Sequence, residues 1–193
     1  MTGPSDDALP GDEPTGDRTM RIHSAEFRAM HQRVLEVTEL TSRLNVLPFD
    51  DVAGKAALFA QIFGRPLPDD VTVYPPFFTD DGRNIAFEGR VFVNQNCTFL
   101  DSSGITLGHR TMIGPKVTFI TGGHPVDPAD RKLFLTGEPI ALEENVWIGA
   151  GATILPGVTI GRDSVIAAGA VVADDVPPQT LVAGPKASVV RRW

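Results

Sequence analysis

An aliphatic residue returns at every sixth position through much of the second half of this sequence. The uninterrupted series is Leu142, Ile148, Ile154, Ile160, Ile166 and Val172. The fourth place of the same hexads holds small or aliphatic residues, namely Val146, Ala152, Val158, Ser164, Ala170 and Val176. A helix repeats every 3.6 residues and a strand every 2, so neither produces this pattern. A parallel β-helix does, because each flat face of its triangular coil takes six residues and points one inward. The sequence therefore predicts a mainly β fold.

The hexads extend upstream in two frames that differ by two positions. Phe87, Val93, Phe99 and Ile105 hold the first frame, and Leu107, Ile113 and Phe119 hold the second. We expect the β-helix over residues 71–180. The pattern breaks at about residues 122–139, a stretch too long for a corner and too polar for a face. We expect this stretch to leave the coil as an excursion loop, and such loops are usually functional or disordered.

The two ends of the chain have other compositions. Residues 1–20 are rich in Gly, Pro, Asp and Thr, which predicts a disordered tail, and Met20 is an alternative start. Residues 21–70 form a helical segment in our prediction, with one helix from the N-cap Ser24 to about Leu44 and another from Asp51 to Phe63. For residues 181–193 we expect a short C-terminal tail or helix.

The composition excludes several function classes. The net charge is −7, which argues against a nucleic-acid-binding face. No apolar run approaches 18 residues and the N-terminus is acidic, which argues against a membrane span and against a secretory signal. Cys97 is the only cysteine, so no internal disulfide can form. We therefore expect a cytoplasmic protein.

Two histidines, His109 and His124, fall within the predicted coil. His124 opens the excursion in the sequence Gly-Gly-His-Pro, where the glycines permit tight backbone geometry and the proline stiffens the loop. An imidazole that titrates near neutrality is the usual general base for a hydroxyl. A plain surface histidine fits His124 equally well, and a corner position is the better interpretation of His109.

Several short motifs occur in an order typical of one family. They are Asn94-Gln-Asn-Cys-Thr98, Ile113-Gly-Pro115, Gly123-His-Pro125, Asn145-Val-Trp-Ile-Gly149, Ile154-Leu-Pro-Gly-Val-Thr-Ile-Gly161, Pro177-Pro178 and Val182-Ala-Gly184. Across residues 24–193 the chain resembles the maltose and galactoside O-acetyltransferases of the hexapeptide-repeat acyltransferase superfamily. The resemblance implies a left-handed parallel β-helix, a homotrimer with active sites between subunits, and acetyl-CoA as donor. It implies no metal.

The resemblance also implies roles for individual residues. His124 would be the base that deprotonates an acceptor hydroxyl as it attacks the thioester. Asn94 would line the same cleft, where its amide contacts the acyl donor or the acceptor. Trp147 would lie beside the thioester, with Ala150 and Ala168 along the pantetheine arm. Asp80, Asp101 and Ser102 match places that contact a sugar-like acceptor, and Glu26 is the nearest candidate for a further acceptor-binding acid. The coenzyme's nucleotide end would lie near four further residues: Ala173, Asp174, Lys186 and Arg191.

This sequence departs from the family pattern at that nucleotide end. Ala173-Asp174 replaces the usual Thr-Lys, and Gly184-Pro-Lys-Ala-Ser188 replaces Gly-Asn-Pro-Ala-Lys, so Asp174 would repel a phosphate. Thr136 stands where the family has a glutamate, with Glu138 close by. Alternatives therefore stay open: transfer to a xenobiotic such as an antibiotic, or a degenerate scaffold without catalysis. A zinc enzyme of the γ-carbonic anhydrase type would need three histidines, one more than the coil contains.

Overall fold

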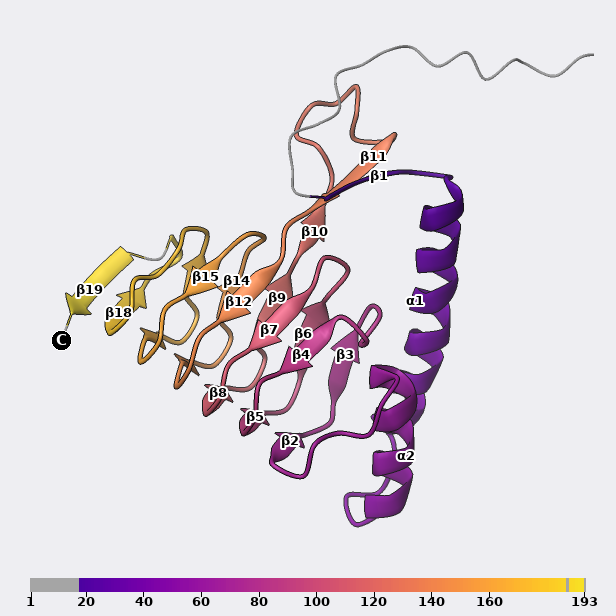
Figure 1. The fold of residues 1–193 in the computed structure, drawn as a ribbon, viewed down its shortest axis with the longest axis horizontal. Helices are drawn as coiled ribbons and strands as arrows, with labels where there is room; N and C mark the ends of the chain where they lie inside the picture. Colours follow the sequence, from indigo (N-terminus) through magenta and orange to yellow (C-terminus); the bar gives the residue numbers. More distant parts are fainter. Residues whose placement is uncertain (1–17, 187, 193) are drawn as a thin grey trace, which may run out of the picture.

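The computed structural model describes residues 18–186 and 188–192, and its main body is a parallel β-helix with helices at the N-terminal end (Figure 1). Three sheets form the faces of the coil. The first contains β2 (Val71–Val73), β5 (Val91–Val93), β8 (Thr111–Ile113), β13 (Trp147–Ile148), β16 (Val165–Ile166), β18 (Thr180–Ala183) and β19 (Ser188–Arg192). The second contains β3 (Phe77–Thr79), β6 (Cys97–Leu100), β9 (Thr118–Ile120), β14 (Thr153–Ile154) and β17 (Val171–Val172). The third contains β4 (Ile85–Phe87), β7 (Ile105–Leu107), β12 (Ile140–Leu142) and β15 (Thr159–Ile160).

The hexad residues point into the coil, as predicted. The uninterrupted series from Leu142 to Val172 is buried, with no member more than 1% exposed. The shift between the upstream frames has a simple cause in the strand register. Val71 pairs with Val91 and Val91 with Thr111, whereas Trp147 pairs with Val165, so the early coils take 20 residues and the later one 18. The two extra residues lie at the corners.

Both predicted helices are confirmed. In α1 (Ala25–Leu44) the Ser24 hydroxyl accepts a hydrogen bond from the Phe27 N–H at 3.1 Å. The α2 helix (Val52–Phe63) starts at Asp51 and ends at Gly64, where a φ of +68° suits glycine. Phe63 of α2 packs on Phe77 with ring centroids 5.7 Å apart, so α2 covers the N-terminal end of the coil's core.

The predicted C-terminal boundary is wrong. The coil continues past residue 180, because β18 pairs in parallel with β16, with Leu181 opposite Val165. In place of the predicted tail or helix, the described residues Ser188–Arg192 form β19, which folds back antiparallel on β18. Two consecutive valines, Val189 and Val190, favour this extended conformation.

The predicted N-terminal tail also ends earlier than expected. Residues 18–20, which the prediction places in this tail, belong to strand β1 (Arg18–Arg21). This strand pairs antiparallel with β11 (Phe134–Gly137), which pairs in turn with β10 (Gly122–Gly123). Residues 1–17 of the predicted tail lie outside the described residues.

The excursion is an arm inserted between β9 and β12, and we call residues 122–137 the arm. The Glu138 N–H donates to the Thr121 carbonyl at 2.9 Å and closes its base. Regular coiling then resumes at once, because Ile140 pairs with Ile105. Figure 1 shows the arm projecting from the coil, with α1 running from the arm along the first coils.

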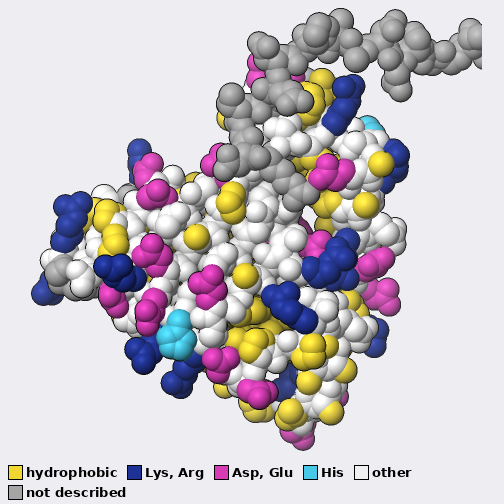
Figure 2. Space-filling model, in the orientation of Figure 1, with side chains coloured by type: hydrophobic (Ala, Val, Ile, Leu, Met, Phe, Trp, Pro, Cys, Tyr) yellow, Lys and Arg dark blue, Asp and Glu magenta, His cyan; other side chains and the backbone are white. Residues whose placement is uncertain are grey.

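The outer surface carries charges of both signs. Figure 2 shows basic and acidic side chains interspersed over the described part of the visible face. Among the described residues, no helix is both long enough and apolar enough to cross a bilayer.

Candidate active site

His124 lies in the arm directly after β10, and the arm itself sets the orientation of its ring. Nδ1 of His124 lies 2.9 Å from the backbone carbonyl of Arg131. The guanidinium of Arg131 donates to the Val126 carbonyl at 2.7 Å, which ties the two sides of the arm together. A carbonyl oxygen can only accept, so the hydrogen of a neutral imidazole must be on Nδ1. The lone pair is then on Nε2, and this nitrogen can act as a base.

His124 borders an open groove of about 530 Å³, which we call the arm groove. It brings together residues from α1, the turn after β3, the corner after β6, and the arm. Its lining residues are Met20, Glu26, Ala29, Met30, Val34, Asp80, Asp81, Arg83, Asn84, Leu100, Ser102, Gly122, Gly123, His124, Leu135 and Thr136. The sequence-predicted residues His124, Asp80, Ser102 and Glu26 are therefore neighbours in one groove.

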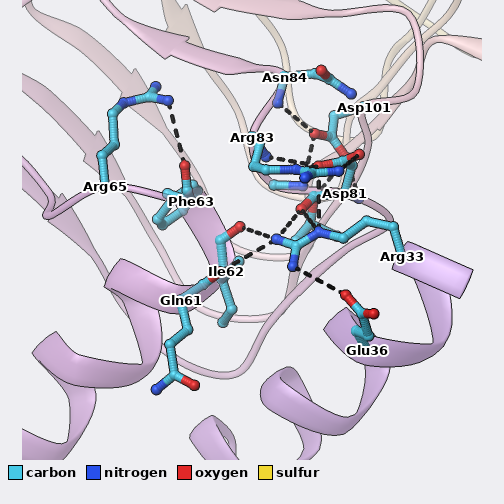
Figure 3. Close-up of polar contacts among 12 residues, drawn as sticks. Arg33, Glu36, Gln61, Ile62, Phe63, Arg65, Asp81, Arg83, Asn84 and Asp101 are labelled. Carbon is cyan, nitrogen blue, oxygen red and sulfur yellow. Dashed lines mark hydrogen bonds and ion pairs between the residues drawn. The ribbon is translucent and has the colours of Figure 1, made fainter. Parts of the chain in front are cut away.

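Asp101 does not line the arm groove, contrary to its predicted contact with an acceptor. Its side chain is fully buried, and its carboxylate accepts four hydrogen bonds. The donors are the Thr79 hydroxyl at 2.8 Å and the backbone N–H groups of Asp81 at 2.9 Å, Gly82 at 2.8 Å and Asn84 at 3.3 Å. Asp101 is thus a positioning residue that fixes the turn containing Asp80 (Figure 3).

Two arginines hold the same turn from outside. The Arg83 guanidinium bonds the Asp81 carboxylate through two nitrogens, at 2.6 and 2.9 Å. Arg33 reaches from α1 and donates to the backbone carbonyls of Asp81 at 2.9 Å and Ile62 at 2.7 Å (Figure 3). Bidentate guanidinium–carboxylate pairs fix geometry well. The turn is therefore tied to both helices and to the buried Asp101.

Asp80 is the unusual acid of this groove. Burial of its carboxyl, together with the charges of Asp101 and Asp81, raises the pKa of Asp80 to about 6. Asp81 behaves in the opposite way, because its hydrogen bonds to Arg83 outweigh burial and lower its pKa. Near neutral pH, Asp80 can therefore donate a hydrogen bond to a hydroxyl or accept one from it.

A second groove, of about 460 Å³, runs over the first sheet, and we call it the sheet groove. It contains four of the residues matched to the donor: Asn94, Trp147, Ala150 and Ala168. Trp147 is 51% exposed. Asn94 points into the groove, and its side-chain oxygen accepts from the Gln95 N–H at 2.8 Å.

Small residues make the sheet groove a smooth channel. A Cβ on Gly149 would lie 2.5 Å from the backbone nitrogen of Ala168, so glycine is required where adjacent coils meet. Ala150 and Ala168 are exposed beside it, and they leave backbone groups accessible. A surface of this kind suits a narrow, extended chain such as pantetheine, whose amide groups can bond the accessible backbone groups.

The remaining predicted donor residues lie elsewhere. Ala173 and Asp174 follow β17, Lys186 precedes β19 and Arg191 lies within it; all are exposed, and none lines either groove. Sequence reasoning assigned no site role to Met20, Met30, Leu135 and Thr136, which all line the arm groove. The sequence gives a signal only for Thr136, which stands where the family has a glutamate. In the described part of the chain, no three His, Cys, Asp or Glu side chains gather into a group that could hold a metal.

Comparisons with known proteins agree with this architecture. Residues 140–174 match the family model for the bacterial transferase hexapeptide, six repeats. The galactoside O-acetyltransferase of Lactococcus lactis subsp. lactis is 32% identical over 179 residues, which cover 89% of this chain and 86% of the relative.

Solved structures extend the likeness. A hexapeptide-repeat acetyltransferase of Vibrio cholerae O1 biovar eltor, complexed with acetyl coenzyme A, is 37% identical with a TM-score of 0.77, and the match covers 88% of this chain and 90% of that one. A maltose O-acetyltransferase of Clostridium difficile 630 is 32% identical with a TM-score of 0.81, over 87% of this chain and 90% of that one. With its hexapeptide coil, its arm and its channel of small residues, the chain belongs to the hexapeptide-repeat acyltransferases, in the branch of the galactoside and maltose O-acetyltransferases, and is an acetyltransferase that uses acetyl-CoA.

Proposed function

We propose that this acetyltransferase transfers the acetyl group to a hydroxyl of a sugar or similar small polyol, with His124 as the general base. The observation that carries the proposal is the bond from His124 Nδ1 to the Arg131 carbonyl beside a groove lined by Asp80 and Ser102. Carboxylates and hydroxyls suit a polyol because each oxygen can accept a hydroxyl hydrogen bond.

The proposed reaction is a direct attack. The acceptor oxygen attacks the thioester carbon as Nε2 of His124 takes its proton, and a C–O bond forms. The tetrahedral intermediate then collapses, the C–S bond breaks, and coenzyme A leaves as the thiolate. The proton from the acceptor ends on the thiolate, which restores the neutral imidazole.

The proposed assembly is a homotrimer with an active site at each subunit contact. The arm groove and the sheet groove share no lining residue, so one chain does not place donor and acceptor in a common space. A neighbouring subunit that covers the sheet groove would bring its own His124 to the thioester. Exposed apolar side chains, Met112 at 48% and Trp147 at 51%, support burial of this face.

Replacement of His124 tests the proposal. We expect His124→Ala to lower kcat at least about a hundredfold, because the acceptor loses its base. The measurement is thiol release from acetyl-CoA with mono- and disaccharides as acceptors. His109→Ala is the matched control, since His109 is exposed at a corner, where its ring Nδ1 accepts a hydrogen bond from the Arg90 N–H at 3.2 Å. An unchanged rate in His124→Ala, with the oligomer intact, contradicts the mechanism.

A further inference from the structure

We propose that strand β1 completes the acceptor site and that Met20 determines how large an apolar group the acceptor can carry there. This inference rests on the proposed function, because it concerns the groove that His124 borders. It assigns a specificity role to a residue that precedes both helices and the coil in the sequence.

The first step is the pairing of β1 with the arm. Met20 lies opposite Leu135 and Arg21 opposite Phe134, and the Ile22 N–H donates to the Leu133 carbonyl at 2.8 Å. Strand β11 pairs on its other side with β10, the strand that leads into His124. Strand β1 is therefore fixed relative to the arm and brings residue 20 to the groove.

The second step is the position of the Met20 side chain. It is 6% exposed and lines the arm groove together with Met30 and Leu135. The same three side chains line a much smaller hollow of about 20 Å³, which also touches Ser102, Ser103, Thr136 and Gly137. Met20 borders both spaces, as do Met30, Leu135, Ser102 and Thr136, and together these residues form the wall that the two spaces share. Shortening the Met20 side chain would join the small hollow to the groove.

The third step is the chemical division of the groove. One side carries the polar groups of Asp80, Asp81 and Asn84, which suit hydroxyls. The side formed by Met20, Met30 and Leu135 is apolar. An acceptor that fills both sides is a polyhydroxylated ring with an apolar substituent, and methionine adapts to such groups because it is flexible and polarisable.

Alkyl glucosides with methyl, propyl and pentyl chains test this assignment. We expect Met20→Ala to raise the ratio of kcat/KM for the pentyl over the methyl glucoside about tenfold, a typical discrimination for added methylenes in an apolar pocket. Met20→Leu should keep the wild-type ratio, because it restores most of the volume. The KM for acetyl-CoA should stay unchanged in both variants. Leu35→Ala is the control, since Leu35 is an exposed apolar residue of α1 that lines neither hollow.

An unchanged ratio in Met20→Ala overturns the inference, and so does an equal change in Leu35→Ala. Calorimetric titration of the same glucosides without acetyl-CoA separates this inference from the proposed function. If the wild type transfers acetyl to no hydroxyl acceptor, the glucosides included, yet Met20→Ala binds the pentyl glucoside more tightly, the proposed function fails and the size role of Met20 in the groove stands. If no variant binds any glucoside, the inference is overturned, whereas transfer to another hydroxyl acceptor would leave the function intact.

Discussion

One backbone carbonyl, that of Arg131, decides which nitrogen of His124 is available for chemistry. The family pattern directs attention to a glutamate twelve residues after the histidine, and this chain has Thr136 there. The contact that orients the ring comes instead from the main chain of the arm, where any residue type could supply it. Residue identity therefore predicts His124 as a candidate base, but it could not predict the group that orients the ring.

Asp80 gives a prediction for pH. Because its pKa is raised from 3.8 to about 6 in the fold, the folded state binds this proton more tightly than the unfolded state. The protonated Asp80 carboxyl therefore contributes its full share to the free energy of unfolding below about pH 4. This contribution falls as the pH rises, and above about pH 6 the ionised carboxylate destabilises the fold. We expect Asp80→Asn to raise the unfolding midpoint at pH 8 by about 2 °C or more, and to change it little at pH 4.

Thermal unfolding of both proteins at the two pH values checks this expectation. The magnitude stays modest because Asp80 is only partly buried. Equal midpoints at pH 8 would show that the carboxylate is stabilised in the turn rather than strained by Asp101 and Asp81.

At the scale of elements, the regular parts were predictable and the exceptions were not. Hexad spacing identifies the coil because every inward position of the uninterrupted series, such as Ile154, must hold an aliphatic side chain that fits the buried core. The pairing of β1 with β11 joins residues more than a hundred positions apart and has no periodic signature. Likewise, Asp101 and Ser102 are adjacent in sequence, yet Asp101 is buried and Ser102 lines the groove. Both lie in the corner after β6, where no periodic pattern predicts the direction of a side chain.

The pairing of β1 can be tested with proline. In an antiparallel ladder the N–H groups alternate in direction, so Ile22 donates to β11 and the Arg21 N–H points away. We expect Ile22→Pro to detach β1, to speed hydrogen exchange of the arm, and to lower kcat about tenfold or more through displacement of His124. The measurements are exchange mass spectrometry and thiol release.

Arg21→Pro is the matched control for that experiment. It sits on the same edge strand, and its N–H has no partner in β11, so exchange in the arm should stay close to that of the wild type. Equal exchange rates in Ile22→Pro and the wild type would mean that the arm keeps its shape without β1.

At the scale of the whole molecule, the proposed trimer has a measurable mass. We expect light scattering to give about three times the 20.7 kDa of one chain. Met112→Glu should dissociate the trimer and abolish transfer, because it puts a charge into the exposed apolar face beside Trp147. Val46→Glu, at an 80% exposed residue after α1, should change neither property. A monomeric wild type that is fully active would refute the shared site.

The closed base of the arm has a consequence for how such a molecule can diversify. The Glu138 N–H bonds the Thr121 carbonyl, and β12 pairs in parallel with β7 despite the residues inserted between β9 and β12. The inserted segment can thus be lengthened, trimmed or exchanged while the stacked scaffold keeps its register. Exchange at this junction would alter one wall of the acceptor groove and leave the stacked coils in register, provided that the new segment keeps the strand that pairs with β1.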